Sequence, residues 1–459
     1  MFQRRHAEGA ALMQRTIRPE RVMALGFLIM ILTGALLLTL PAATAAGESI
    51  GFGNALFTAT SAVCVTGLVV VDTGTTFSLF GQIVLIALIQ MGGLGFMVFA
   101  TLVMVALGRR ITLRSRMLMR ESMNTTTLSG LVRLTGWYGL LVALIELGGA
   151  AILAVRFVPL LGWGRGIYFS IWHAISAFCN AGFDLFGNFT SLTSFAGDPL
   201  VLLTVALLII LGGIGFAVIS EVSEQRFRWR PLSLHARVTL LMTCVLLVMG
   251  TAFIALAEWG NPATLGLVEG AGNKVANAFF QAATMRTAGF NSINLTAMTD
   301  ASKFMSVLLM FVGASSASTG GGVKTTTVAV LLLCVWSVVR GDEDIAVMGK
   351  RLSPALVRRA LAIVMVALLI LITGTMLLTL AEEGRYPFID VLFETTSAMA
   401  TVGVTSIGTP ALTSVSQAVR IPMMYFGRVG PLTMALAMAQ KQGAGKARIR
   451  YPEENITIG

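Results

Sequence analysis

The stretch FTATSAVCVTG, which ends at Gly67, has three related stretches further along the chain: WHAISAFCNAG ending at Gly182, FFQAATMRTAG ending at Gly289 and FETTSAMATVG ending at Gly403. Each begins with an aromatic residue ten positions before its glycine. The glycines follow one another at intervals of about 110 residues, and self-similarity at a fixed period is the sequence signature of a repeated structural unit.

The composition of the 459-residue chain indicates a membrane protein. Of its residues 56% are hydrophobic and 12% are charged, and its mean hydropathy is +0.82, which excludes a soluble globular protein. Apolar runs such as 22–40 and 199–219 reach the ~20 residues that a helix needs to cross a bilayer. Four cysteines without a CxxC pair predict neither a disulfide framework nor a zinc site. No polar stretch is long enough for a separate domain, so nucleotide-binding machinery is expected on a partner.

The first apolar run has a second interpretation. A basic lead and the sequence Ala43-Thr44-Ala45 also fit a secretory signal peptide. Apolar regions of signal peptides hold ~7 to 15 residues, fewer than the run 22–40, and removing this run would break the repeat. We therefore expect it to be the first spanning helix.

Each glycine stretch lies between two long apolar segments and is itself too short and too rich in Ser, Thr and Gly to span, so it predicts a re-entrant segment. Each copy then crosses the membrane twice, and all copies have the same orientation. The predicted fold is an all-α polytopic membrane protein, with eight spanning helices and four re-entrant half-helices around a central pore. The copies are expected at 1–120, 121–235, 236–350 and 351–459.

The basic residues predict the topology. The amino-terminal lead and four further segments hold 23 of the 33 lysines and arginines; the four are 109–120, 226–237, 340–359 and 441–450. By the positive-inside rule these segments and both termini are cytoplasmic, and the net charge of +11 reflects topology and contact with membrane lipid instead of nucleic-acid binding. The opposite segments carry eleven acids against six bases (Arg156, Arg165, Lys274, Arg286, Lys303 and Arg385), so we expect a negative outer mouth that concentrates cations. The acids are Glu48, Asp72, Asp184, Asp198, Glu258, Glu269, Asp300, Glu382, Glu383, Asp390 and Glu394.

The residues that end the four stretches are candidates for an ion filter. An ion leaving water needs its hydration oxygens replaced, and four converging backbone segments can supply rings of carbonyls, with glycine allowing the unusual dihedrals. No carboxylate is present, which favours a weakly hydrated monovalent cation over calcium. The other interpretation is that each glycine is an ordinary helix cap. The candidate filter residues are Val65, Thr66, Gly67, Asn180, Ala181, Gly182, Thr287, Ala288, Gly289, Thr401, Val402 and Gly403.

A second glycine motif follows each candidate filter glycine; it reads GGLGF from Gly92, GGIGF from Gly212, GASSA from Gly313 and GRVGP from Gly427. Small residues permit close helix approach near the axis. Arg428 occupies the second position of the fourth copy, where a cation is expensive and usually marks a pathway or a buried partner. We expect it to be a barrier in the pore; pairing with a buried carboxylate is the alternative.

The third copy contains GASSASTGGGVKTTT, from Gly313 to Thr327, where a continuous helix is disfavoured. The stretch is not a Walker A motif, because Val323 and not glycine precedes Lys324. It predicts an intramembrane gating loop beneath the filter, with a glycine-rich packing kink as the alternative. The candidate gate residues are Gly313, Ala314, Ser315, Ser316, Ser318, Thr319, Gly320, Gly321, Gly322, Lys324 and Arg428.

Together, the four filter segments, the 313–327 loop, Arg428 and the closing RYPEENITIG resemble the Trk/Ktr/HKT superfamily of potassium transporters, and within it the membrane component of the bacterial Ktr potassium uptake system. The resemblance implies potassium uptake across the bacterial inner membrane, often sodium-stimulated, by a homodimer with one pore per subunit. It also implies regulation by a cytoplasmic ring of RCK subunits that bind the nucleotide, with no organic cofactor in this chain. Gly67 places the chain with potassium-selective members, because serine there marks sodium-preferring plant members.

Two other function classes compete with a gated potassium pathway. An alternating-access transporter of a small organic solute usually shows inverted repeats and a midplane site of carboxylates or aromatics, whereas these copies are parallel. A membrane enzyme is the third class, but His6, His173 and His235 lie far apart in the sequence. Glu146, on an apolar segment, is interpreted as the partner of a buried base.

Overall fold

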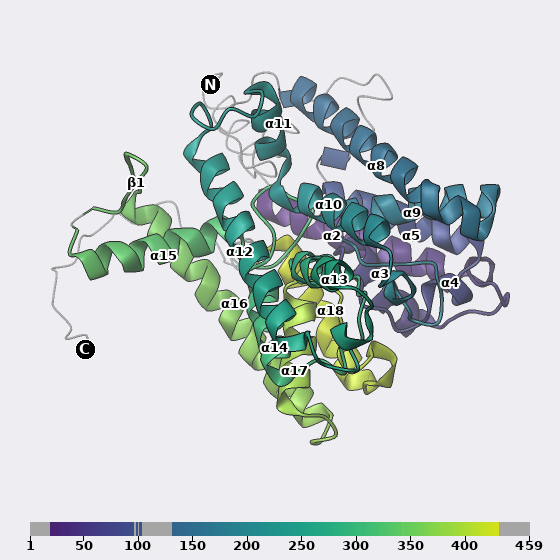
Figure 1. Ribbon diagram of the computed structural model, residues 1–459. Coiled ribbons are helices and arrows are strands. Elements are labelled where there is room, and N and C mark those ends of the chain that lie inside the picture. Colours follow the sequence, from purple (N-terminus) through teal and green to yellow (C-terminus); the bar gives the residue numbers. More distant parts are fainter. Residues whose placement is uncertain (1–18, 96–97, 100, 103–130, 343, 431–459) are drawn as a thin grey trace, which may run out of the picture.

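The computed structural model describes residues 19–95, 98–99, 101–102, 131–342 and 344–430, and this part of the chain is predominantly helical (Figure 1). Four helices are each long and apolar enough to cross a membrane. They are α2 (Pro19–Thr39), α8 (Leu131–Leu161), α12 (Leu234–Glu258) and α16 (Pro354–Ala381). Their outward faces are apolar, with Leu256 83% and Leu380 71% exposed, as expected for surfaces that meet lipid. The expectation of an all-α membrane protein is confirmed.

A shorter helix follows each long one and packs against it. These helices are α3 (Phe52–Val63), α9 (Trp163–Phe178), α13 (Ala271–Thr284) and α17 (Phe388–Met399). With 12 to 16 residues each, they are too short to cross a ~30 Å hydrocarbon layer. Their carboxyl-terminal halves are almost completely buried, so they enter the molecule from its edge and end inside it.

A third helix completes each group; the set is α5 (Leu79–Leu94), α10 (Pro199–Ile214), α14 (Asp300–Phe311) and α18 (Ser414–Val429). Ser78, Asp198, Thr299 and Thr413 precede these helices, and each side chain accepts a hydrogen bond from an N–H of the first turn. The same capping geometry therefore starts all four third helices.

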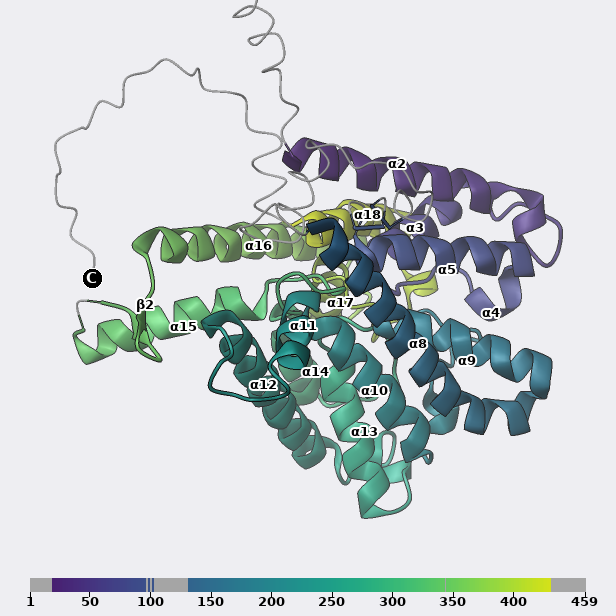
Figure 2. The same cartoon turned by 90° about the horizontal axis from the view of Figure 1, so that it is seen from above.

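The groups close into a ring. The third helix of each group packs on the short helix of the next: α5 on α9, α10 on α13 and α14 on α17; finally α18 packs on α3. In Figure 2, α2, α12 and α16 lie towards the outside of the molecule. The short helices are thus held between two groups, and their carboxyl ends meet near the middle.

Two of the third helices, α10 and α14, do not continue straight. At Gly215, α10 bends by 96° into α11 (Phe216–Glu224), and α14 gives way to a loop before α15 (Thr325–Arg340). Glycine breaks leave four single spans among the described residues, or five if the bent pair counts as one. The count of eight spanning helices and the four copy boundaries therefore stay predictions.

The remaining elements are small. They are α4 (Thr73–Thr76), the 3₁₀ turns η1 (Pro41–Ala43), η2 (Thr193–Phe195), η3 (Leu265–Leu267) and η4 (Thr409–Ala411), and the strands β1 (Ala346–Val347) and β2 (Lys350–Arg351). The two strands form an antiparallel hairpin between α15 and α16. Figures 1 and 2 show that this hairpin and the adjoining helix ends project from one side of the molecule.

Candidate functional site

The four candidate filter segments, called filter segments below, are 65–67, 180–182, 287–289 and 401–403, and they have the same unusual backbone. Their first residues have positive φ values of 54° at Val65, 58° at Asn180, 75° at Thr287 and 53° at Thr401. Their glycines have φ values of 92°, 70°, 88° and 97° in chain order. Left-handed backbone is uncommon for residues other than glycine, and it is especially unfavourable for the β-branched valine and threonine. A strain repeated in all four copies indicates a shape that the surrounding structure imposes.

The four glycines lie against one another around one point. A Cβ atom placed on any of them would come within 2.7 Å of backbone in a neighbouring segment. The pairs are Gly67 with Ala181, Gly182 with Gly289, Gly289 with Val402, and Gly403 with Thr66. Segments more than a hundred residues apart in the chain thus converge, and a side chain has no space at these positions.

A buried hydroxyl holds each segment. The N–H groups of Gly67 and Gly403 donate to Ser61 Oγ and Ser397 Oγ, each at 3.1 Å. In the other two copies the hydroxyl donates instead, from Ser176 to the Phe183 carbonyl and from Thr284 to the Phe290 carbonyl, each at 2.7 Å. The sequence interpretation missed these residues. The signal was available, since a serine or threonine stands five or six positions before every filter glycine.

The second glycine motif lets the third helices approach the ends of the short helices. Gly92, Gly212 and Gly427 leave no space for a Cβ atom beside the carbonyl groups of Val63, Phe178 and Met399, respectively. Three residues later the helices end at Gly95, Gly215 and Gly430, with φ values of 80°, 103° and 97°. The third helices of copies one, two and four therefore all end at a glycine, three residues after this close approach.

In the third copy, the 313–324 segment occupies this level as a loop. It is shorter than the predicted loop 313–327, because the last three residues form the first turn of α15. The N–H groups of Ser315 and Thr319 donate to the carbonyls of Gly213 and Gly212, at 2.9 and 3.2 Å. The Thr319 hydroxyl donates to the Phe178 carbonyl at 3.1 Å. Next to them, Gly320 and Gly321 leave no space for a Cβ beside the hydroxyls of Thr287 and Thr401. The loop thus lies directly against the first residues of the filter segments.

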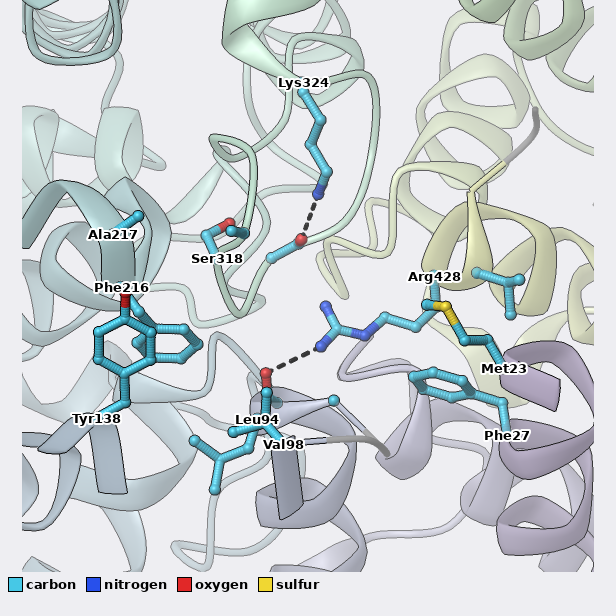
Figure 3. A pocket seen from close by; sticks show the side chains of 15 residues that line it. Met23, Phe27, Leu94, Val98, Tyr138, Phe216, Ala217, Ser318, Lys324 and Arg428 are labelled. Carbon is cyan, nitrogen blue, oxygen red and sulfur yellow. Dashed lines mark hydrogen bonds between the residues drawn. The ribbon is translucent and has the colours of Figure 1, made fainter. Parts of the chain in front are cut away.

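Two basic side chains, those of Lys324 and Arg428, donate hydrogen bonds to backbone carbonyl groups at the same level. Lys324 Nζ donates to the Gly320 carbonyl at 2.7 Å and to the Gly321 carbonyl at 3.4 Å. The Arg428 guanidinium donates to the carbonyls of Thr319 and Gly92, and to that of Gly93 at 3.1 Å (Figure 3). Among the residues that the structure describes, no carboxylate lies within ion-pair distance of Arg428. The guanidinium ties the third-copy loop to the end of α5.

Cavities lie on both sides of the filter segments. One of about 150 Å³ is lined by Arg428, Lys324, Ser318 and Tyr138 (Figure 3). On the opposite side, a cavity of about 70 Å³ is lined by all four filter glycines together with Asp72 and Asp184. The site therefore has an anionic entrance on one side and a cationic one on the other.

The two aspartates differ in their surroundings. Asp72 caps α4 by accepting from the Thr75 N–H, and it also accepts from the Phe189 N–H, both at 2.8 Å. Burial raises the pKa of Asp184 to about 7; the Phe186 N–H lowers it, and the Asp72 carboxylate raises it. Asp184 therefore changes its charge near neutral pH.

Several other acids expected at the outer mouth are structural. Glu394 on α17 forms a completely buried ion pair with Arg420 on α18 at 2.8 Å, and it accepts from the N–H groups of Ser406 and Ile407 just beyond the fourth filter segment. Lys303 and Asp390 form a second buried pair at 2.8 Å. The negative mouth is consequently smaller than the count of acids in the sequence suggested.

Glu146 also differs from expectation. Its carboxylate accepts from Gln90 Nε2 at 3.0 and 3.3 Å, and no base lies within ion-pair distance in the part of the chain that the structure describes. Gln90 Oε1 in turn accepts from the Cys179 thiol at 3.2 Å. The partner of Glu146 is thus an amide next to the second filter segment. No cluster of three metal-binding side chains occurs in the described residues.

The ring of helices and its four convergent glycine segments define a membrane transport protein. Residues 20–447 match the family model of TrkH, described as a cation transport protein, so the chain belongs to the TrkH family. The family resemblance predicted from the sequence is confirmed.

The chain is similar to several named proteins. It is 42% identical to the Ktr system potassium uptake protein B of Bacillus subtilis, over 96% of this chain and 97% of that one. It is 41% identical to the protein of the same name from Vibrio alginolyticus (96% and 94%) and 38% identical to the potassium/sodium uptake protein NtpJ of Enterococcus hirae (97% and 98%). The crystal structure of the potassium transporter TrkH from Vibrio parahaemolyticus has the same fold, with a TM-score of 0.66 and 18% identity over 90% of this chain and 84% of that one.

Proposed function

We propose that this protein takes up potassium across the cytoplasmic membrane through the point where its four filter segments meet. The observation that carries the proposal is the repeated backbone, with left-handed first and third residues in all four segments. Left-handed residues that alternate with an ordinary one turn successive carbonyl groups to the same side of an extended segment. Four such segments would form rings of oxygens that replace the hydration shell of an ion. The relatives named for potassium uptake support the choice of ion.

The filter would select among cations through the dipoles of its backbone carbonyl groups, not through charged side chains. Its twelve residues contain no carboxylate, and the short helices direct the partly negative carbonyls of their carboxyl ends towards it. Such a site suits a weakly hydrated monovalent cation, with potassium as the main substrate and sodium as a second ion. The name of the Enterococcus relative, a potassium/sodium uptake protein, supports that second ion.

The gate of this pathway is formed by the loop 313–324 and Arg428. The loop lies against Thr287 and Thr401, and the arginine holds it to α5, so both stand in the way of an ion that leaves the filter. A fixed positive charge in a low-dielectric passage also repels a cation more strongly than it would in water. Opening requires the loop to leave the carbonyl groups of Gly212 and Gly213.

The cationic side of the molecule is cytoplasmic in this proposal, as are both termini. The protein acts as a homodimer, and a cytoplasmic nucleotide-binding ring of RCK type regulates it through the basic segments of that face. The names of the Bacillus and Vibrio relatives, which assign each of them to a Ktr system, support a second component. In this proposal sodium stimulates the potassium flux. The alternative to a gated potassium pathway is alternating-access transport of a small organic solute.

Potassium flux into proteoliposomes, measured with and without sodium, tests the proposal. Gly67→Ser introduces a side chain where the Ala181 carbonyl leaves no space, so the ratio of potassium to sodium flux should fall at least tenfold, equal to about 1.4 kcal/mol. Gly47→Ser is the matched control, since Gly47 also has a positive φ but no atom within 4 Å of its Cβ position. An unchanged ratio in Gly67→Ser, or uptake of organic solutes without potassium flux, would overturn the proposal.

A further inference from the structure

A third, larger cavity lies beside the gate region and outside the route through the filter. It measures about 500 Å³ and is bounded by α12, α15, α16 and the β1–β2 hairpin. The charged or titratable side chains that line it are all bases: His235, Lys324 and Arg359. Hydroxyl groups of Ser316, Thr326 and Thr327 and apolar residues of α15 and α16 complete its wall. The cavity is therefore amphipathic, with positive charge and no acid among its lining residues.

An apolar groove continues from this cavity. It measures about 480 Å³, contains no charged lining residue, and shares Val238, Leu333 and Val347 with the basic cavity. Its outer wall is the face of α15 that carries Trp336, which is 58% exposed. The Arg340 guanidinium lies 4.8 Å from the centre of the Trp336 ring, at the end of the helix. A charged end and an apolar end thus form one continuous surface.

We propose that this surface is a binding site for one anionic phospholipid, with the phosphate at Arg359 and His235 and an acyl chain in the groove beside Trp336. Both ends are needed for the assignment. Phosphate alone would leave the apolar groove exposed, whereas a neutral lipid would leave the Arg359 guanidinium, which forms no ion pair among the described residues, without a counter-charge. Basic pockets between spanning helices on the cytoplasmic side are suited to anionic headgroups.

The position of the site connects it with the gate. Ser316 lies in the loop and Thr326 in the first turn of α15; their hydroxyls are 3.0 Å apart, and both line the cavity. Lys324 lines this cavity and the one below the filter. A bound headgroup would therefore contact the loop from outside the pathway and stabilise one of its positions. This consequence rests on the proposed gating function, but the binding site itself does not.

Lipid binding to the delipidated full-length protein tests the site. Native mass spectrometry would compare phosphatidylglycerol with phosphatidylcholine of the same acyl chains, and we expect phosphatidylglycerol to bind at least tenfold more tightly. Arg359→Gln should abolish this preference, whereas Arg359→Lys should keep it. Arg358→Gln is the matched control, because Arg358 is the neighbouring arginine on α16 and lines neither cavity.

Several results would overturn the site. These are equal binding of the two lipids, an undiminished preference in Arg359→Gln, or displacement of the lipid by glycerol phosphate at equal concentration, which would make the site one for a free phosphate. Release of the lipid when two chains associate would assign the surface to a second copy instead. Because binding is measured without flux, a failed flux experiment on the filter leaves this result unaffected.

Discussion

The level of the filter glycines and the level just below it are built differently. In the filter, all four copies have the same φ pattern, and a hydroxyl of the same copy holds each segment. Below it, three copies end in a glycine break, while the third supplies a loop whose polar groups bind carbonyls of its neighbours. Near-fourfold symmetry suits coordination of a spherical ion, and one asymmetric element suits opening and closing. The comparison predicts that changes at the two levels have different effects.

The largest expected effect is the loss of the buried charge pair behind the fourth filter segment. In Glu394→Ala, Arg420 stays buried without a counter-charge, which costs about 3–5 kcal/mol. The thermal unfolding midpoint in detergent should fall strongly. Glu269→Ala, at an exposed position, should leave the midpoint unchanged. An unchanged unfolding midpoint in Glu394→Ala would show that the level of the filter glycines does not depend on this ion pair.

The second effect concerns the loop. Deleting Ser315–Gly320 removes half of the loop, including Gly320, which lies against Thr287, and leaves the four filter glycines unchanged. Flux per folded molecule should rise about tenfold, equal to about 1.4 kcal/mol in the barrier, and the potassium-to-sodium ratio should be kept. If the deletion does not fold, Thr319→Val serves instead, because it removes only the hydrogen bond to the Phe178 carbonyl. A folded variant that conducts no faster would identify the loop as a packing kink.

The third effect is that of the fixed charge. Arg428→Gln removes the charge and weakens the ties to Thr319 and Gly92, so flux should rise about two- to fivefold, less than in the loop deletion. Arg428→Lys keeps the charge with fewer donors and separates the two contributions. If the lysine variant behaves as the glutamine variant does, hydrogen bonding to the loop, and not charge, closes the passage.

The sequence predicted the filter level better than the level below it. The spaced glycines predicted four related segments, and these converge in the structure, because a structure that repeats must repeat its backbone requirements. The family, which was inferred from these segments together with the 313–327 loop, Arg428 and the closing residues, is confirmed as well. The positive φ of Val65 was not predictable, since valine has no preference for it and only the packed ring imposes it. Glu394 and Asp390 were assigned to the outer mouth because a count of charges does not show which side chains turn inward. The carbonyl partners of Arg428 were not predictable either, because the sequence does not show which backbone groups a side chain meets.

The smallest expected effect is a pH dependence of the apparent potassium affinity, which tests the anionic entrance. The pKa of Asp184 is about 7, above its ordinary range because of burial, so the carboxyl is neutral at pH 6 and charged at pH 8. The added negative charge beside Asp72 should attract potassium, and the apparent affinity should be about twofold better at pH 8 at low ionic strength.

Asp184→Asn should remove this pH dependence without changing the potassium-to-sodium ratio, because the side chain lines the cavity outside the filter and belongs to none of its segments. Added salt should diminish the effect, since it screens the attraction between the charged entrance and potassium ions in the surrounding solution over about 10 Å at 0.1 M ionic strength. The measurement is the half-saturating potassium concentration of the flux at both pH values, for both proteins. A pH dependence that persists in Asp184→Asn would place the titrating group elsewhere and leave the outer entrance without a role in attracting the ion.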